Sequence, residues 1–215
     1  AMSRLAIKIC GLSTTDTVGA AVRAGASHIG FVHFPKSPRH VDTGQIRALA
    51  AIAPAHVERV GVVVDPTDEM LDELVATGAL TALQLHGKES AQRAAAIRHR
   101  SGLSVWKAIS VKTRADIEAA SAYTGAVDRL LFDAKTPDGA ALPGGMGLRF
   151  DWTLLRGVAV PGPWGLSGGL SADNVAEAVR ITGAPLIDVS SGVESAPGIK
   201  DMDKIITFCK AVSQC

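Results

Sequence analysis

The sequence contains few cysteines, and charge of neither sign is concentrated in any part of it. Its three cysteines, Cys10, Cys209 and Cys215, are odd in number and lack the spacing of a disulfide framework or a metal motif. Such thiols favour a reducing compartment. The formal net charge is +1, and no block of Lys or Arg forms a basic patch. We therefore expect no nucleic-acid partner, and an anionic ligand has to be held by a few local groups.

Long hydrophobic runs are also missing. No segment offers the roughly 20 uninterrupted apolar residues that a bilayer-spanning helix needs. The first four residues lack the apolar stretch of a secretory signal, and Ala1 before Met2 is typical of an added residue. We expect residues 1–4 to be disordered or an added end, and the protein to be cytoplasmic with no membrane partner.

Eight short segments rich in β-branched residues recur along the chain and are predicted as strands. They cover residues 5–10, 28–34, 59–64, 81–86, 104–109, 129–133, 164–168 and 186–190. Segments with helical periodicity lie between them, several of them followed by a glycine that stops the helix. In the last such segment, Cys209 shares an apolar stripe with Ile205 and Val212 and is expected in the core.

Strand and helix alternate at a spacing of about 22 to 35 residues, which favours parallel strands joined by crossover helices. Eight such units predict a single (β/α)8 TIM barrel, an α/β fold, as one domain over residues 1–215. A doubly wound open sheet has the same alternation, but no Gly-x-Gly-x-x-Gly turn follows the first strand. The barrel is therefore the preferred architecture.

The first predicted strand ends on a thiol, Cys10, at the edge where barrel enzymes carry their chemistry. A lone cysteine is usually a small buried hydrophobe, and that alternative stays open. Alternation along the strand places Lys8 on the same face, and inside a barrel it needs a partner, for which Asp188 on the closing strand is expected. Asp133 ends the sixth strand, so Cys10 and Asp133 form a candidate base and acid across the mouth.

An unusually long connection follows Asp133 and runs to a helix expected near Phe150. Its glycines, including Gly145 and Gly147, permit close approach of the backbone to a ligand. Loops of this length in an economical chain are typical of lids and ligand clamps. An idle surface loop is the alternative.

Small residues follow the last two predicted strands. In barrels, loops at these positions commonly bind phosphate through backbone N–H groups. The candidates are Gly168 and Gly169 in one loop, and Ser190, Ser191 and Gly192 in the other. Tight turns with no ligand are the alternative.

Two further side chains are expected at the mouth. Arg39, in a turn stiffened by Pro35 and Pro38, has the forked donors that bind a carboxylate. The alternative for Arg39 is a solvated surface position. His86 ends the fourth predicted strand and faces the mouth. A metal role would need more ligands than His33 and the scattered aspartates supply, so no metal is expected.

These motifs together resemble the phosphoribosylanthranilate isomerase family of tryptophan biosynthesis. The matching stretches are Lys8 to Gly11, Gly30 to Arg39, Gln84 to Gly87, Phe132-Asp133, Gly144-Gly145-x-Gly147 with Phe150 to Trp152, Leu166 to Leu170, Asp188 to Glu194 and Pro197 to Asp201. The likeness spans nearly the whole chain in order.

The resemblance implies an Amadori rearrangement of N-(5-phosphoribosyl)anthranilate, without metal or organic cofactor. It implies Asp133 as general acid, Cys10 as general base, Arg39 as the group that holds the anthranilate carboxylate, and the loops around Gly168 and Ser191 as the phosphate site. Rival hypotheses are another phosphosugar isomerase or epimerase, a histidine-pathway barrel isomerase with a second aspartate in place of Cys10, and a phosphate-binding protein without activity. Monomer and homodimer are both compatible with the sequence.

Overall fold

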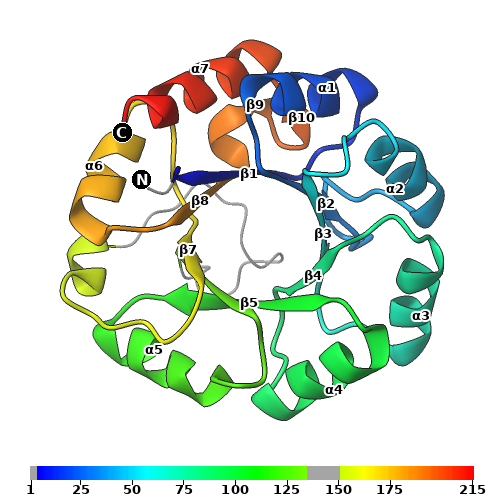
Figure 1. The fold of residues 1–215 in the computed structure, drawn as a ribbon, viewed down its shortest axis with the longest axis horizontal. Coiled ribbons are helices and arrows are strands. Elements are labelled where there is room, and N and C mark those ends of the chain that lie inside the picture. The colour runs from blue at the N-terminus through cyan, green and yellow to red at the C-terminus, as the bar shows by residue number, and fades with distance from the viewer. Residues whose placement is uncertain (1–3, 135–150) are drawn as a thin grey trace.

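The structure is a computed structural model that describes residues 4–134 and 151–215. Eight parallel strands form a closed barrel in the order of the chain, and helices surround them (Figure 1). The strands are β1 (Ala6–Cys10), β2 (His28–Val32), β3 (Glu58–Val63), β4 (Ala82–Leu85), β5 (Ser104–Val111), β6 (Arg129–Ala134), β7 (Trp164–Leu166) and β8 (Leu186–Val189). Pairing of β1 with β8 closes the ring, with Lys8 opposite Asp188. The predicted barrel is confirmed, with strand ends shifted by one or two residues.

Helices that begin at polar caps connect most of these strands. They are α1 (Thr15–Ala24), α2 (Thr43–Ala50), α3 (Asp68–Ala76), α4 (Ala91–Ser101), α5 (Arg114–Ala119), α6 (Val175–Thr182) and α7 (Met202–Ser213). The side chains of Thr14, Thr67 and Ser90 accept a bond from a backbone N–H in the first turn. No helix in the described part of the chain is long and apolar enough to cross a membrane.

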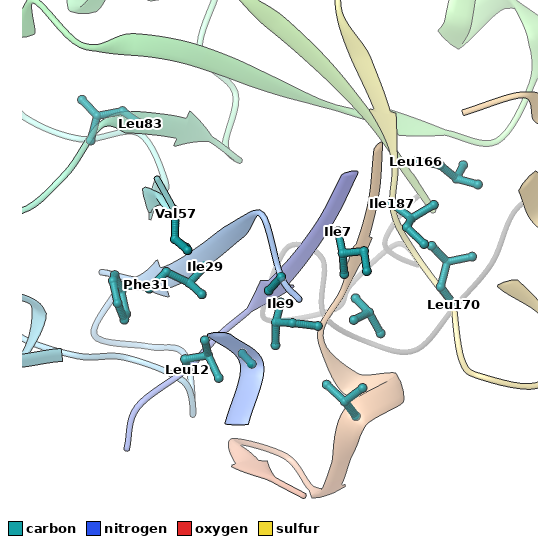
Figure 2. Packing of buried hydrophobic residues seen from close by; sticks show 14 of the residues in the cluster. Ile7, Ile9, Leu12, Ile29, Phe31, Val57, Leu83, Leu166, Leu170 and Ile187 are labelled. Atoms are coloured by element: carbon teal, nitrogen blue, oxygen red, sulfur yellow. The ribbon is translucent and has the colours of Figure 1, made fainter. Parts of the chain in front are cut away.

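Apolar side chains fill two separate spaces. The larger cluster lies between the barrel and its helices, and Figure 2 shows Ile7 and Ile9 of β1 packed within it. A smaller cluster, Val60, Ala82, Trp106, Leu131 and Leu186, comes from five different strands and fills the inside of the barrel. Because side chains alternate along a strand, Lys8, Cys10 and Asp133 point to this interior side.

Two connections differ from the sequence prediction. The helix expected near Phe150 is wrong: the described residues there contain one 3-10 turn, η2 (Trp152–Leu155). Gly157 has a positive φ of 73° and Pro161 and Pro163 follow, so an α-helix cannot continue. After β8, a 3-10 turn η3 (Ser191–Val193) leads into a hairpin of β9 (Glu194–Ala196) and β10 (Ile199–Lys200), which the strand pattern did not predict.

Candidate active site

Cys10 is the last residue of β1 and is 6% exposed. Its sulfur lies against Gly30 of β2, where an added β-carbon would be 2.7 Å from Sγ and 3.2 Å from Nζ of Lys8. Only glycine leaves room for the thiol and the ammonium together at this point. Cys209 is buried in α7 as expected, whereas Cys10 is buried among polar groups at the end of the barrel strands.

Lys8 is fully buried and forms the predicted ion pair with Asp188, Nζ to Oδ1 2.9 Å. The other oxygen of Asp188 accepts a 2.9 Å bond from Oγ of Ser167, so both its oxygens have partners. Burial opposes the charge of Lys8, but Asp188 and the adjacent Cys10 outweigh it and raise the pKa of Lys8. A permanent ammonium therefore lies beside the thiol.

Asp133 lies one residue before the end of β6 and is 4% exposed. Its Oδ2 is 3.1 Å from Nε2 of His86, which follows β4. The structure thus brings together two of the residues predicted at the mouth. This contact with the imidazole fixes the direction of the carboxyl group.

Arg39 does not lie on the surface: it is 8% exposed and bonded to Glu194. Its Nε and Nη2 donate to the two carboxylate oxygens at 2.9 and 2.6 Å, which is a bidentate pair. Lys200 donates to the same carboxylate at 2.9 Å and to the carbonyl and hydroxyl of Ser190.

This cluster lies over Gly11, the residue that follows Cys10. A β-carbon on Gly11 would be 2.7 Å from Cδ of Arg39, 3.2 Å from Oγ of Ser190 and 3.3 Å from Nζ of Lys200, and the glycine has a φ of 81°. Hydrogen bonds from Arg39 and Lys200 overcome the effect of burial and hold the pKa of Glu194 below its usual range. Glu194 is therefore ionised at neutral pH.

The two predicted phosphate loops lie side by side. A β-carbon on Gly192 would clash with the carbonyl oxygen of Leu170, so the loop after β8 touches the backbone of the loop after β7. Gly168 and Gly169 have φ values of 91° and 70°, a conformation that favours glycine. The backbone amides of both loops are thus brought to one end of the barrel.

Some predictions cannot be located. Gly145 and Gly147 lie outside the described residues. Within residues 4–134 and 151–215, no three His, Cys, Asp or Glu side chains gather as they do around a metal ion.

Glu194 and Lys200 were not among the residues predicted for the site. The short hairpin that carries them has no clear alternation, so their contact with Arg39 follows only from the fold. The available signal was that both residues lie in stretches that carry the family resemblance, Asp188 to Glu194 and Pro197 to Asp201. Glu89 was also missed; it is 4% exposed and pairs with Lys107 at 2.8 Å below the loop that carries His86.

A family model described as N-(5'phosphoribosyl)anthranilate (PRA) isomerase matches residues 7–211. The chain belongs to this isomerase family. The N-(5'-phosphoribosyl)anthranilate isomerase of Zymomonas mobilis subsp. mobilis is 55% identical over 206 residues, which are 95% of this chain and 96% of that protein. The family predicted from the sequence is confirmed, and the protein is an isomerase of tryptophan biosynthesis.

Solved structures of the same family have the same barrel. The isomerase of Thermotoga maritima, described as dimeric and studied as monomers, is 34% identical with a TM-score of 0.81, and the match covers 98% of this chain and 100% of that one. A phosphoribosyl anthranilate isomerase in complex with reduced 1-(o-carboxyphenylamino)-1-deoxyribulose 5-phosphate is 32% identical with a TM-score of 0.82 and the same coverage. That relative binds an analogue carrying a carboxylate and a phosphate.

Proposed function

We propose that this isomerase carries out the Amadori rearrangement of N-(5-phosphoribosyl)anthranilate with Asp133 as general acid and Cys10 as general base. Asp133 protonates the furanose ring oxygen, and the ring opens to a protonated Schiff base. Cys10 removes the proton from C2 of the ribose, and the enolamine tautomerises to 1-(2-carboxyphenylamino)-1-deoxyribulose 5-phosphate. The observation that carries the proposal is the pair of buried acidic groups, Cys10 at the end of β1 and Asp133 one residue before the end of β6, on the interior side of one barrel end.

The polar neighbours of these two groups suit their roles. Lys8 places a buried positive charge beside Cys10, the proposed proton acceptor. His86 holds the Asp133 carboxyl group in place through the 3.1 Å contact. Every step moves a proton, so the proposal includes no metal and no organic cofactor.

Two anion-binding groups complete the proposed site. Arg39 holds the anthranilate carboxylate, and its burial beside the residue after Cys10 supports this role. Backbone amides near Gly168, Gly169, Ser191 and Gly192 hold the phosphate, aided by the hydroxyl of Ser190. We keep Gly145 and Gly147 as proposed ligand contacts of the long connection.

The test is turnover of freshly made phosphoribosylanthranilate, followed by the loss of anthranilate fluorescence with and without a chelator. Wild-type protein is expected to turn over the substrate at the same rate in both conditions, and Cys10→Ala to lose at least ~10²-fold in kcat. Loss of turnover only in the presence of chelator would show that the reaction needs a metal ion, and would contradict the proposed metal-free mechanism. Absence of turnover by folded wild-type protein contradicts the proposed mechanism.

The remaining proposals concern assembly and location. We propose a small-molecule substrate as the partner, with no nucleic-acid or membrane partner, in the cytoplasm. The Thermotoga maritima relative is described as dimeric. Sedimentation velocity of this protein decides between the monomer and the homodimer.

A further inference from the structure

Glu194 takes part in no step of the proposed mechanism. It begins β9, directly after the 3-10 turn that follows β8, and is 7% exposed. Its carboxylate is bonded by cations from two directions, Arg39 from the turn after β2 and Lys200 from β10. Arg39 is the proposed binding group for the substrate carboxylate. The carboxylate of Glu194 would therefore compete with substrate for Arg39, unless it helps Arg39 to bind in another way.

The geometry points to Glu194 as a positioning residue that holds Arg39 ready for the anthranilate carboxylate. This inference rests on the proposed role of Arg39. Glu194 bonds Nε and Nη2, the two nitrogens on one edge of the guanidinium, so the plane of the fork is fixed before substrate binds. An arginine already held in one orientation loses less side-chain entropy when it binds a ligand.

The position of Lys200 explains why Glu194 helps Arg39 to bind the substrate carboxylate more than it competes with that carboxylate. Its side chain is 1% exposed, and burial together with the charge of Arg39 lowers its pKa, an effect that Glu194 only partly offsets. Without the carboxylate of Glu194, the two cations face each other in a buried space. Arg39 would then move away from Lys200 and from Gly11, and its guanidinium would no longer lie near Cys10.

The hairpin keeps this arrangement rigid. Gly198, at the turn between β9 and β10, lies so close to the Arg39 turn that an added β-carbon would be 2.6 Å from the carbonyl oxygen of Pro38. The hairpin and the Arg39 turn therefore touch through the backbone as well as through Glu194. Lys204 of α7 donates a 2.9 Å bond to the backbone carbonyl of Glu194, so this contact does not involve the carboxylate that binds Arg39.

The test compares two ligands by calorimetry. One is reduced 1-(o-carboxyphenylamino)-1-deoxyribulose 5-phosphate, and the other is the same compound with a phenyl ring that lacks the carboxylate. Glu194→Gln is expected to weaken the first ligand about 10-fold and to leave the second unchanged, because the charged bond to Arg39 is lost. Lys204→Gln is the matched control, since it alters a contact of Glu194 without touching Arg39, and it is expected to bind both ligands as the wild type does.

Arg39→Ala and the double variant Arg39→Ala/Glu194→Gln show whether the effect passes through Arg39. In the Arg39→Ala background, Glu194→Gln is expected to have no further effect on either ligand. Tighter binding of the carboxylate ligand by Glu194→Gln, an equal loss for both ligands, or a full additional loss in the double variant overturns the inference.

The outcomes also separate this inference from the proposed function. Arg39→Ala with wild-type affinity for both ligands contradicts the role of Arg39 itself. Selective loss in Arg39→Ala but not in Glu194→Gln contradicts only the positioning role. If Glu194→Gln does not fold, Glu194→Asp carries the test: it keeps the charge but is too short to reach both nitrogens, so a smaller loss confined to the carboxylate ligand is expected. Wild-type binding of both ligands by Glu194→Asp overturns the inference.

Discussion

Lys8 and Asp188 form an ion pair inside the barrel, with 2.9 Å between Nζ and Oδ1 and almost no exposure of either side chain. The pair joins the first strand to the last and so closes the barrel at the level just below Cys10. The pair holds the first and last strands together, and the ammonium of Lys8 also places a positive charge beside the thiol of Cys10. Such a pair is costly to break, since the remaining charge has no water to solvate it.

Asp188→Asn is expected to lower the free energy of unfolding by about 3–5 kcal/mol, because it leaves the ammonium of Lys8 buried without a counter-charge. Urea unfolding measures the change. The surface pair variant Asp72→Asn removes a carboxylate bonded to Arg100 at 2.8 Å, and is expected to leave the urea midpoint close to that of the wild type because solvent screens the pair. Equal effects of the two substitutions would show that the interior pair carries no special weight.

Asp133→Asn is expected to lower kcat by about 10²–10⁴-fold with little change in KM, because the amide cannot supply the proton. His86→Gln keeps a donor near Asp133 but loses the imidazole, and a smaller loss of about 10-fold is expected. Steady-state fluorescence assays give both constants, and thermal unfolding checks that the variants fold. Near-normal turnover by Asp133→Asn removes this residue from the role of acid.

Gly30→Ala is expected to lower kcat by about 10²-fold, because the new β-carbon would lie 2.7 Å from Sγ of Cys10 and push the thiol out of place. The control is Gly19→Ala in α1, where the nearest atom is the flexible end of Arg23 at 2.9 Å. That variant should keep its activity and gain about 0.5–1 kcal/mol in stability. Assays of both variants at equal folded concentration measure the difference, and a fully active Gly30→Ala enzyme contradicts the tight fit of the thiol.

The barrel could be predicted from sequence because its signals are local. Each strand is a short β-branched run, and glycines such as Gly102 mark the ends of helices. The pairing of Lys8 with Asp188 also followed, since alternation places both inside a ring whose first and last strands are neighbours. The helix expected near Phe150 failed because Gly157 and the prolines after it limit the segment to one 3-10 turn.

The contacts of the site were less accessible to sequence reasoning. Cys10 and Asp133 lie at or next to the end of a strand, a position that can be predicted from sequence. The bidentate bond between Arg39 and Glu194 instead joins residues 155 positions apart. Such a contact depends on how two irregular loops fold over Gly11. The sequence therefore suggested that Arg39 binds a carboxylate, which is chemically correct. It did not show that the carboxylate of Glu194, in the same chain, is bonded to Arg39.

A last prediction concerns the other end of the barrel interior. His28, at the start of β2, packs against the ring of Trp106 at 5.3 Å between centroids. Burial, with smaller effects from the charges of Arg129 and Lys8, lowers the pKa of His28 to about 4. Glu58 and Asp188 act in the opposite direction and do not cancel this effect.

Because the unfolded chain binds a proton at His28 near pH 6.5 and the folded protein does so only near pH 4, stability contributed by the neutral ring is complete above pH 6.5 and is lost as the pH falls toward 4. The full loss amounts to about 3 kcal/mol. Urea unfolding of His28→Gln between pH 4 and 7 should therefore show a shallower decline than the wild type, since the amide does not titrate. His56→Gln, at an exposed position, should keep the wild-type slope. Parallel curves for His28→Gln and the wild type would mean that the ring takes up its proton in the folded protein as readily as in the unfolded chain.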